Sequence, residues 1–88
     1  MSDPNLLISA LEYLQKGEWD LAHKISQENE GDPNFDWIHA RLHKNEGDKS
    51  NSQYWYRTAN QDHFSTDADE ELALMESHFL NLVSEKDQ

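Results

Sequence analysis

The stretch ALEYLQKGEWDLA, residues 10–22, is echoed thirty residues later by ARLHKNEGDKSNS, residues 40–52. Both copies place a small residue, a glycine and a second small residue at identical spacing. Glycine often ends a helix because it adopts left-handed backbone conformations at no steric cost. Each copy is therefore expected to form a helix, a turn at the glycine and a second helix. Since a single hairpin leaves an apolar face uncovered, the echo predicts two stacked helical hairpins.

Apolar residues at helical spacing extend this pattern to the rest of the chain. The first hairpin is expected over about residues 4–30, the second over about 34–60, and a C-terminal packing helix over about 66–85. We therefore expect an all-α fold of about five helices, organised as a single helical domain over residues 1–88.

The expected helix starts carry residues that are typical of N-caps. The candidate caps are Asp3 or Ser2 for the first helix, Asp48 or Ser50 for the fourth, and Ser65 or Thr66 for the last. Acids in the first turn of the last helix, including Glu71, are expected to interact with the positive end of its dipole. The apolar residues of this helix form one stripe, which we expect to pack along the open side of the second hairpin. These residues are Leu72, Met75, Phe79, Leu82 and Val83.

Length and composition limit the class of protein. A chain of 88 residues without cysteine fits one domain of modest stability. Disulfides and sulfur-based zinc sites are therefore excluded. No apolar run approaches the roughly 20 residues of a membrane span, and no signal peptide precedes Asp3 and Pro4. We expect a cytoplasmic protein that has no membrane partner.

The net charge of −11 is unevenly distributed along the chain. Residues 1–33 carry seven acids against two bases and residues 61–88 eight against one, whereas residues 34–60 carry three acids against four bases. Nucleic acids and anionic membranes bind positively charged surfaces, so neither is expected as a partner. An acidic mimic of a nucleic acid, binding a basic protein, is one alternative function.

The first hairpin resembles a tetratricopeptide repeat, in which two antiparallel helices touch at small residues. The matching residues are Ala10, Tyr13, Gly17, Trp19 and Ala22. In the second hairpin the matching residues are Ala40, Gly47, Ser52, Tyr56 and Ala59, while His43 and Lys49 stand where the family has aromatic residues. The two copies are 30 residues apart, whereas the family repeats about every 34 residues. The segment 37–57 is also similar to short bacterial proteins with no assigned function.

The tetratricopeptide resemblance implies a concave surface lined by the first helix of each hairpin, and hence a non-enzymatic protein-binding module or small adaptor. Arg41 and Lys44 lie three apart on the expected third helix and can clamp an acidic side chain or a C-terminal carboxylate. As surface residues, both are expected to tolerate replacement by alanine with little loss of stability. The candidate partner-binding residues are Trp37, Arg41, Lys44, Asn45, Tyr54 and Arg57.

Three consecutive aromatic residues, Tyr54, Trp55 and Tyr56, cannot all point into the core. Neighbouring residues of a helix are about 100° apart around its axis. We expect Trp55 or Tyr56 in the core and Tyr54 at the surface. An exposed Tyr54 beside Arg57 favours a contact with a protein or peptide partner, or with a second copy of the chain in a homodimer.

Two histidines have a spacing that is compatible with metal binding. His39 and His43 lie four apart on the expected third helix and can present two imidazoles to one ion, with Glu46 or Asp36 as a third ligand. A small metal- or ligand-binding protein is therefore a second alternative function. The other histidines, His23, His63 and His78, are expected to lie apart from this pair. The sequence predicts no catalytic residues and no cofactor.

Overall fold

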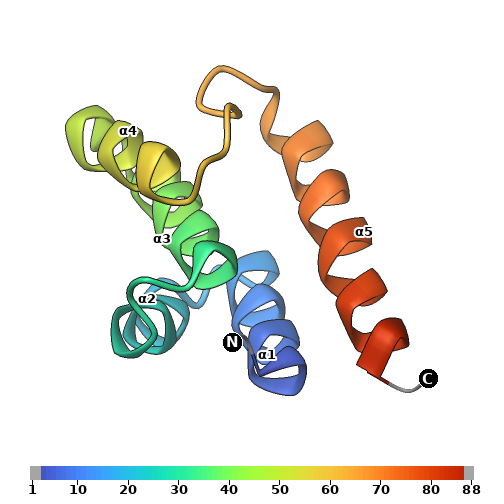
Figure 1. Ribbon diagram of the computed structural model, residues 1–88. Coiled ribbons are helices and arrows are strands. Elements are labelled where there is room, and N and C mark those ends of the chain that lie inside the picture. The colour runs from blue at the N-terminus through green and yellow to red at the C-terminus, as the bar shows by residue number, and fades with distance from the viewer. Residues whose placement is uncertain (1–2, 87–88) are drawn as a thin grey trace.

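The computed structural model describes residues 3–86, which form five α-helices and no strand (Figure 1). The helices are α1 (Pro4–Gln15), α2 (Trp19–Glu28), α3 (Pro33–Glu46), α4 (Lys49–Thr58) and α5 (Ala68–Lys86). The all-α fold with helical hairpins and a C-terminal helix is therefore confirmed. None of the helices in the described part of the chain is long and apolar enough to cross a membrane.

The two glycines of the repeated stretch end helices as predicted. Gly17 and Gly47 have φ angles of 78° and 84°, in the left-handed region that favours glycine. Gly47 caps α3 by donating its backbone N–H to the carbonyls of His43 and Lys44. A further backbone hydrogen bond closes each turn: the Glu18 N–H donates to the Tyr13 carbonyl, and the Asp48 N–H donates to the His43 carbonyl.

Aspartates cap four of the five helices at their N-termini. The side chains of Asp3, Asp32 and Asp48 accept backbone N–H bonds from the first turns of α1, α3 and α4. At α5 the prediction of Ser65 or Thr66 is wrong, because the Asp67 carboxylate accepts the N–H groups of Asp69 and Glu70. Ser2, the alternative cap for α1, lies outside the described residues.

Small residues set the contacts between the first four helices. α1 packs on α2, α2 on α3, and α3 on α4, and α1 also touches α3. Ala10, Ala22 and Ala40 are fully buried at these contacts. The Ser52 hydroxyl of α4 donates to the Ala40 carbonyl of α3 at 3.0 Å, which requires a close approach of the two helices. The small residues of the echo therefore serve the packing role that their spacing predicted.

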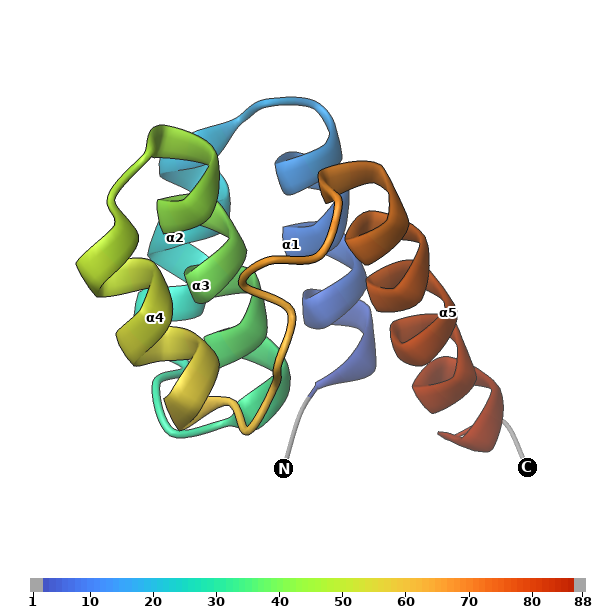
Figure 2. The same ribbon diagram turned by 90° about the horizontal axis from the view of Figure 1, so that it is seen from above.

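Helix α5 lies on the opposite side of α1 from α2 (Figure 2). Its main neighbour is thus α1 of the first hairpin, and the prediction that it packs along the second hairpin is corrected. Met75 and Phe79 of its apolar stripe are fully buried, and the Phe79 ring meets Trp37 of α3 edge-on at 5.7 Å. α5 therefore reaches α3 through side chains, across the surface that α1 and α3 share.

Candidate functional site

Helix α3 carries polar residues into the core on two of its sides. Every residue from Phe35 to His43 is buried. A helix that is buried all round must give each polar side chain a partner, or leave it with an unmet hydrogen-bonding demand. Trp37, Arg41 and Lys44 recur at steps of four and three, and His39 and His43 are four apart, so each set shares one face. The structure shows a different polar cluster on each face.

The first cluster, which we call the Glu71 cluster, is centred on a carboxylate that is 0% exposed. Lys44 Nζ and Trp37 Nε1 each donate to the Glu71 carboxylate at 2.9 Å, and the Tyr56 hydroxyl donates to the oxygen that Trp37 binds. Arg41 Nη1 lies 3.5 Å from the other oxygen. Glu71 of α5 thus receives two cations and two neutral donors from α3 and α4. Its predicted role as a first-turn acid is incomplete, because these partners, and not the helix dipole alone, compensate its burial.

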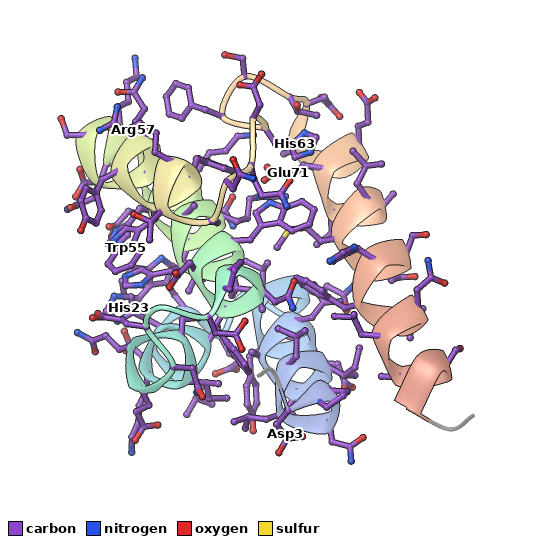
Figure 3. The ribbon with its side chains drawn as sticks, in the orientation of Figure 1. Asp3, His23, Trp55, Arg57, His63 and Glu71 are labelled. Carbon is purple, nitrogen blue, oxygen red and sulfur yellow. The ribbon has the colours of Figure 1, made fainter. Side chains whose placement is uncertain are left out.

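Lys44 of the Glu71 cluster also holds the loop between α4 and α5. Lys44 Nζ donates to the carbonyls of His63 and Thr66 at 3.1 and 2.6 Å. Figure 3 shows His63 and Glu71 close together at this end of α5. Burial, and then the hydrogen bond to Glu71, raise the pKa of Tyr56 far above its usual range. Tyr56 therefore stays a neutral donor to Glu71.

The six predicted partner-binding residues fall into two groups. Trp37, Arg41 and Lys44 face α5 in the Glu71 cluster, and exposed Asn45 extends it by accepting a bond from Arg41 Nε at 2.9 Å. Tyr54 and Arg57 lie instead on the exposed side of α4, and Arg57 points away from Glu71 in Figure 3. Tyr54 is 53% exposed and Tyr56 is buried, as predicted.

Sequence reasoning missed Glu71 and Tyr56 as members of this cluster. A signal for Glu71 was present in the sequence, because it precedes Met75 by four residues and Phe79 by eight. Residues at this spacing share one helix face, so an acid there is drawn into the core with the apolar stripe. An acid on an apolar stripe indicates a buried partner of opposite charge.

The second cluster, which we call the histidine cluster, joins His23 of α2 to His39 and His43 of α3. One ring nitrogen of each histidine lies within 4.8 Å of those of the other two. The His39 and His43 rings stack at 5.0 Å, and the His23 ring meets both of them edge-on. The prediction that His23 lies apart from the pair is wrong. Because His23 follows Trp19 by four residues, it shares the face that α2 turns toward α3.

Two tryptophans enclose the histidine cluster. The Trp55 ring of α4 stacks on His39 with a centroid distance of 4.0 Å, and the Trp19 ring of α2 stacks on His23 at 4.5 Å. Figure 3 shows His23 and Trp55 on the same side of the molecule, away from Glu71. Trp19 Nε1 donates to the Leu42 carbonyl at 2.9 Å, which fixes its indole against α3. The imidazoles are therefore held in an aromatic, largely water-excluded environment.

The histidine cluster has little hydrogen bonding of its own. His39 is 3% exposed, and its Nδ1 atom is buried without a hydrogen-bond partner. His43 Nδ1 lies 2.6 Å from a Glu46 carboxylate oxygen, whereas Asp36 accepts a backbone bond from Gly31 and is not part of the cluster. Burial, and then the neighbouring histidines, lower the pKa of His39 to about 4. Burial also lowers the pKa of His23, so both rings are neutral at pH 7.

The other two histidines lie outside this cluster, as predicted. His63 stacks on Trp37 at 5.5 Å and His78 Nε2 lies 3.2 Å from the Asn34 side-chain oxygen. A shallow hollow of about 220 Å³ lies between the α1–α2 turn and the end of α3. It is smaller than the roughly 300 Å³ at which ligand pockets usually begin. Its lining residues are Leu14, Gly17, Trp19, Leu42, Asn45 and Glu46.

Comparison with known proteins identifies no relative of this chain. Neither a protein-family model, nor a curated protein, nor a solved structure matches it. The chemistry of the two clusters is therefore what indicates a function.

Proposed function

We propose that this protein is a non-enzymatic interaction module that binds an acidic helical segment of a partner protein in the groove that its own α5 fills. The observation that carries this proposal is the convergence on one carboxylate of three hydrogen-bond donors and the Arg41 guanidinium, whose Nη1 atom lies 3.5 Å away. Charge-assisted hydrogen bonds are about twice as strong as neutral ones, so this arrangement selects a carboxylate over other groups. The resemblance to tetratricopeptide repeats supports the same surface, because such hairpins bind with their first helices.

The sequence of α5 indicates which partner would fit. Glu71 occupies the donor cluster, and Met75 and Phe79 are fully buried one and two helical turns later. A partner helix would therefore carry a carboxylate followed by large apolar residues at the fourth and eighth positions. This pattern forms one continuous stripe and allows a helix to lie in a groove.

Tethering gives α5 an advantage over any separate helix. A short linker holds a bound segment at an effective concentration in the millimolar range, roughly, and a partner must overcome this competition. Lys44 strengthens the attachment of α5 further, because its ammonium group binds two carbonyls of the α4–α5 loop. The groove is therefore closed in the free protein, and a partner enters by displacing α5.

A peptide competition tests this proposal. A fluorescent peptide of residues 66–86 is titrated with the Glu71→Gln chain, whose own α5 lacks the carboxylate. A matched chain, Glu70→Gln, makes the same charge change at an exposed neighbour. The peptide should bind the Glu71→Gln chain more tightly than the Glu70→Gln chain. The same peptide carrying Glu71→Gln should bind the Glu71→Gln chain at least about tenfold more weakly than the natural peptide does. A hydrogen bond to a charged group contributes about 1.5–3 kcal/mol.

Circular dichroism of both chains controls for loss of folding. Equal affinity of the two peptides for the helical Glu71→Gln chain would contradict carboxylate recognition. Failure of the peptide that retains Glu71 to bind that chain would contradict a displaceable α5.

A second candidate function, self-association through α4, is favoured by the exposure of Tyr54. Its ring packs edge-on against Trp55, and exposed Arg57 lies three residues further along the same helix. Tyrosine and arginine are enriched among the residues that dominate binding energy at interfaces. Sedimentation equilibrium should detect a dimer that is weakened in Tyr54→Ala, whereas a monomer at every concentration would rule this function out.

A further inference from the structure

We propose that His23, His39 and His43 form a binding site for one divalent transition-metal ion of the zinc, cobalt or nickel class. This inference is independent of the peptide groove, which lies on the other side of α3. The three imidazoles come from two helices and converge within 4.8 Å at their ring nitrogens. Three histidines with an open fourth position are a known ligand set of zinc sites.

The geometry requires only a small adjustment to bind an ion. Zinc–nitrogen bonds of about 2.0–2.1 Å place tetrahedral nitrogens about 3.3 Å apart. The ring nitrogens lie at most 4.8 Å apart, so each distance between them must shorten by no more than about 1.5 Å. His23 is half-buried and sits on α2, so rotation of its side chain can supply this closure. His39 and His43 share one face of α3 and are already stacked.

His39 provides the observation that separates this cluster from ordinary core packing. Its ring is almost fully buried, yet Nδ1 has no hydrogen-bond partner. An unpaired buried polar atom is uncommon in a native core and needs an explanation. A metal ion would use the imidazole without breaking a protein hydrogen bond.

Glu46 lies where it can orient the ring of His43. Its carboxylate oxygen lies 2.6 Å from His43 Nδ1 and directs the opposite ring nitrogen, Nε2, toward a metal. Carboxylates behind metal-binding histidines fix the tautomer and raise the basicity of the ligand. Glu46 is thus a positioning residue that does not itself need to contact the ion.

The donor set indicates the class of metal. Imidazole nitrogens suit zinc, nickel, cobalt and divalent copper, whereas calcium and magnesium prefer oxygen ligands. The chain contains no cysteine, so sulfur ligands cannot contribute. Three protein nitrogens leave the fourth tetrahedral position to water. An ion at this site would join α2 of the first hairpin to α3 of the second, and should stabilise the contact between the hairpins.

A competing site shares one histidine with this cluster. His43, Glu46 and Asp48 also bring three ligand atoms within 4.8 Å of one another. The Asp48 carboxylate, however, already accepts the backbone N–H of Asn51 and its side-chain amide at the start of α4. An ion there would weaken the cap of α4. The three-histidine site is therefore favoured.

Calorimetric titration of the untagged chain with zinc chloride tests the proposal, because a polyhistidine tag would itself bind the ion. We expect one ion per chain and a melting temperature that rises with zinc concentration. His23→Gln should weaken binding by more than about tenfold, since even outer partners of metal ligands are worth about 10–100-fold. His78→Gln, the same change outside the cluster, should leave the affinity unchanged.

Two further measurements make the result decisive. Visible absorption of bound Co²⁺ should show a four-coordinate ion with three nitrogen ligands and one water in the natural chain, and lose this signature in His23→Gln. Absence of zinc binding to the natural chain would overturn the proposal, as would equal binding by His23→Gln. Binding that is lost in Asp48→Asn but kept in His23→Gln would overturn it in favour of the competing site.

Discussion

The two faces of α3 use buried polar groups in opposite ways. On the face toward α5, Glu71 accepts three hydrogen bonds and pairs with two cations, although Arg41 Nη1 contacts it only as an ion pair at 3.5 Å, without a hydrogen bond. On the face toward α2 and α4, three imidazoles gather with a neutral His39 and an unpaired nitrogen. The first face is electrically compensated within the chain. The second face leaves His39 Nδ1 without a hydrogen-bond partner, and it is there that a metal ion is proposed to bind.

This difference separates two kinds of buried polar cluster in one small domain. A compensated carboxylate fixes how neighbouring elements dock, because removing one partner leaves the others desolvated and unpaired. A buried polar atom that has no hydrogen-bond partner lowers stability unless a ligand pairs with it.

Removal of the Glu71 carboxylate should have the largest effect on folding. Glu71→Ala leaves Arg41 and Lys44 in the interior without their counter-charge. Breaking a buried ion pair from one side costs about 3–5 kcal/mol, which is comparable to the stability of a small domain. Urea unfolding should show this loss, while Glu70→Ala at the exposed neighbour should change stability by less than about 0.5 kcal/mol. A Glu71→Ala loss below about 1 kcal/mol would show that the face is not compensated as described.

Acidification should destabilise the protein through the histidine face. The pKa of His39 is lowered to about 4, against a reference value of 6.5, so the unfolded chain binds the proton first. The contribution of neutral His39 to the free energy of unfolding is therefore fully present above pH 6.5. It falls by about 3 kcal/mol as the pH decreases toward 4. His23 acts in the same direction, while Asp36, whose pKa is raised by burial, acts in the opposite one.

The variant His39→Gln isolates the contribution of His39 to this pH dependence. Unfolding free energies measured between pH 7 and 4 should have a shallower slope in this variant than in the natural chain. An unchanged slope would mean that His39 is not the group that titrates.

The helix contacts beneath both faces should resist larger residues. Ala22→Leu and Ala40→Leu each add a side chain at a fully buried position. Overpacking of this type costs about 1–3 kcal/mol. Ala73→Leu, at an exposed position of α5, is the matched control and should be almost neutral in thermal unfolding. Unchanged melting of both buried variants would contradict close packing of the hairpins.

The contact between His43 and Glu46 on the histidine face should contribute least to stability. His43 and Glu46 are three apart on α3, and the Glu46 side chain is well exposed. Such pairs contribute about 0.3–0.5 kcal/mol in water. Glu46→Gln should therefore shift the urea midpoint only slightly. A loss comparable to that of Glu71→Ala would remove the contrast between the two faces.

The structure replaces one expectation about Arg41 and Lys44. Taken as surface residues, they were predicted to tolerate alanine with little loss of stability. Arg41 is buried, and Lys44 is largely covered, against Glu71. Their joint replacement would leave that carboxylate buried without a counter-charge, so a large destabilisation is now expected. A binding assay with that double variant would not separate a lost contact from lost folding.

Local sequence was sufficient to predict the helices and their turns. Gly17 and Gly47 end helices because their backbone conformation favours glycine, and the small residues Ala22 and Ala40 lie at close helix contacts. The outward position of Tyr54 followed from the helical period alone. These features depend on neighbours within one or two turns, which the sequence displays directly.

Only the tertiary structure decided which faces meet. Helical periodicity shows that Glu71 shares a stripe with Phe79, and that His23 shares a face with Trp19, but it does not identify the helix opposite. Glu71 meets Trp37 across 34 residues of chain, and His23 meets His39 across a turn between hairpins. The contact between Glu71 and Trp37 depends on the direction that α5 takes after its loop, toward α1. The contact between His23 and His39 depends on the packing of α2 on α3. A side chain is buried only where a neighbouring helix covers it, so its burial depends on that neighbour as well as on its own helix.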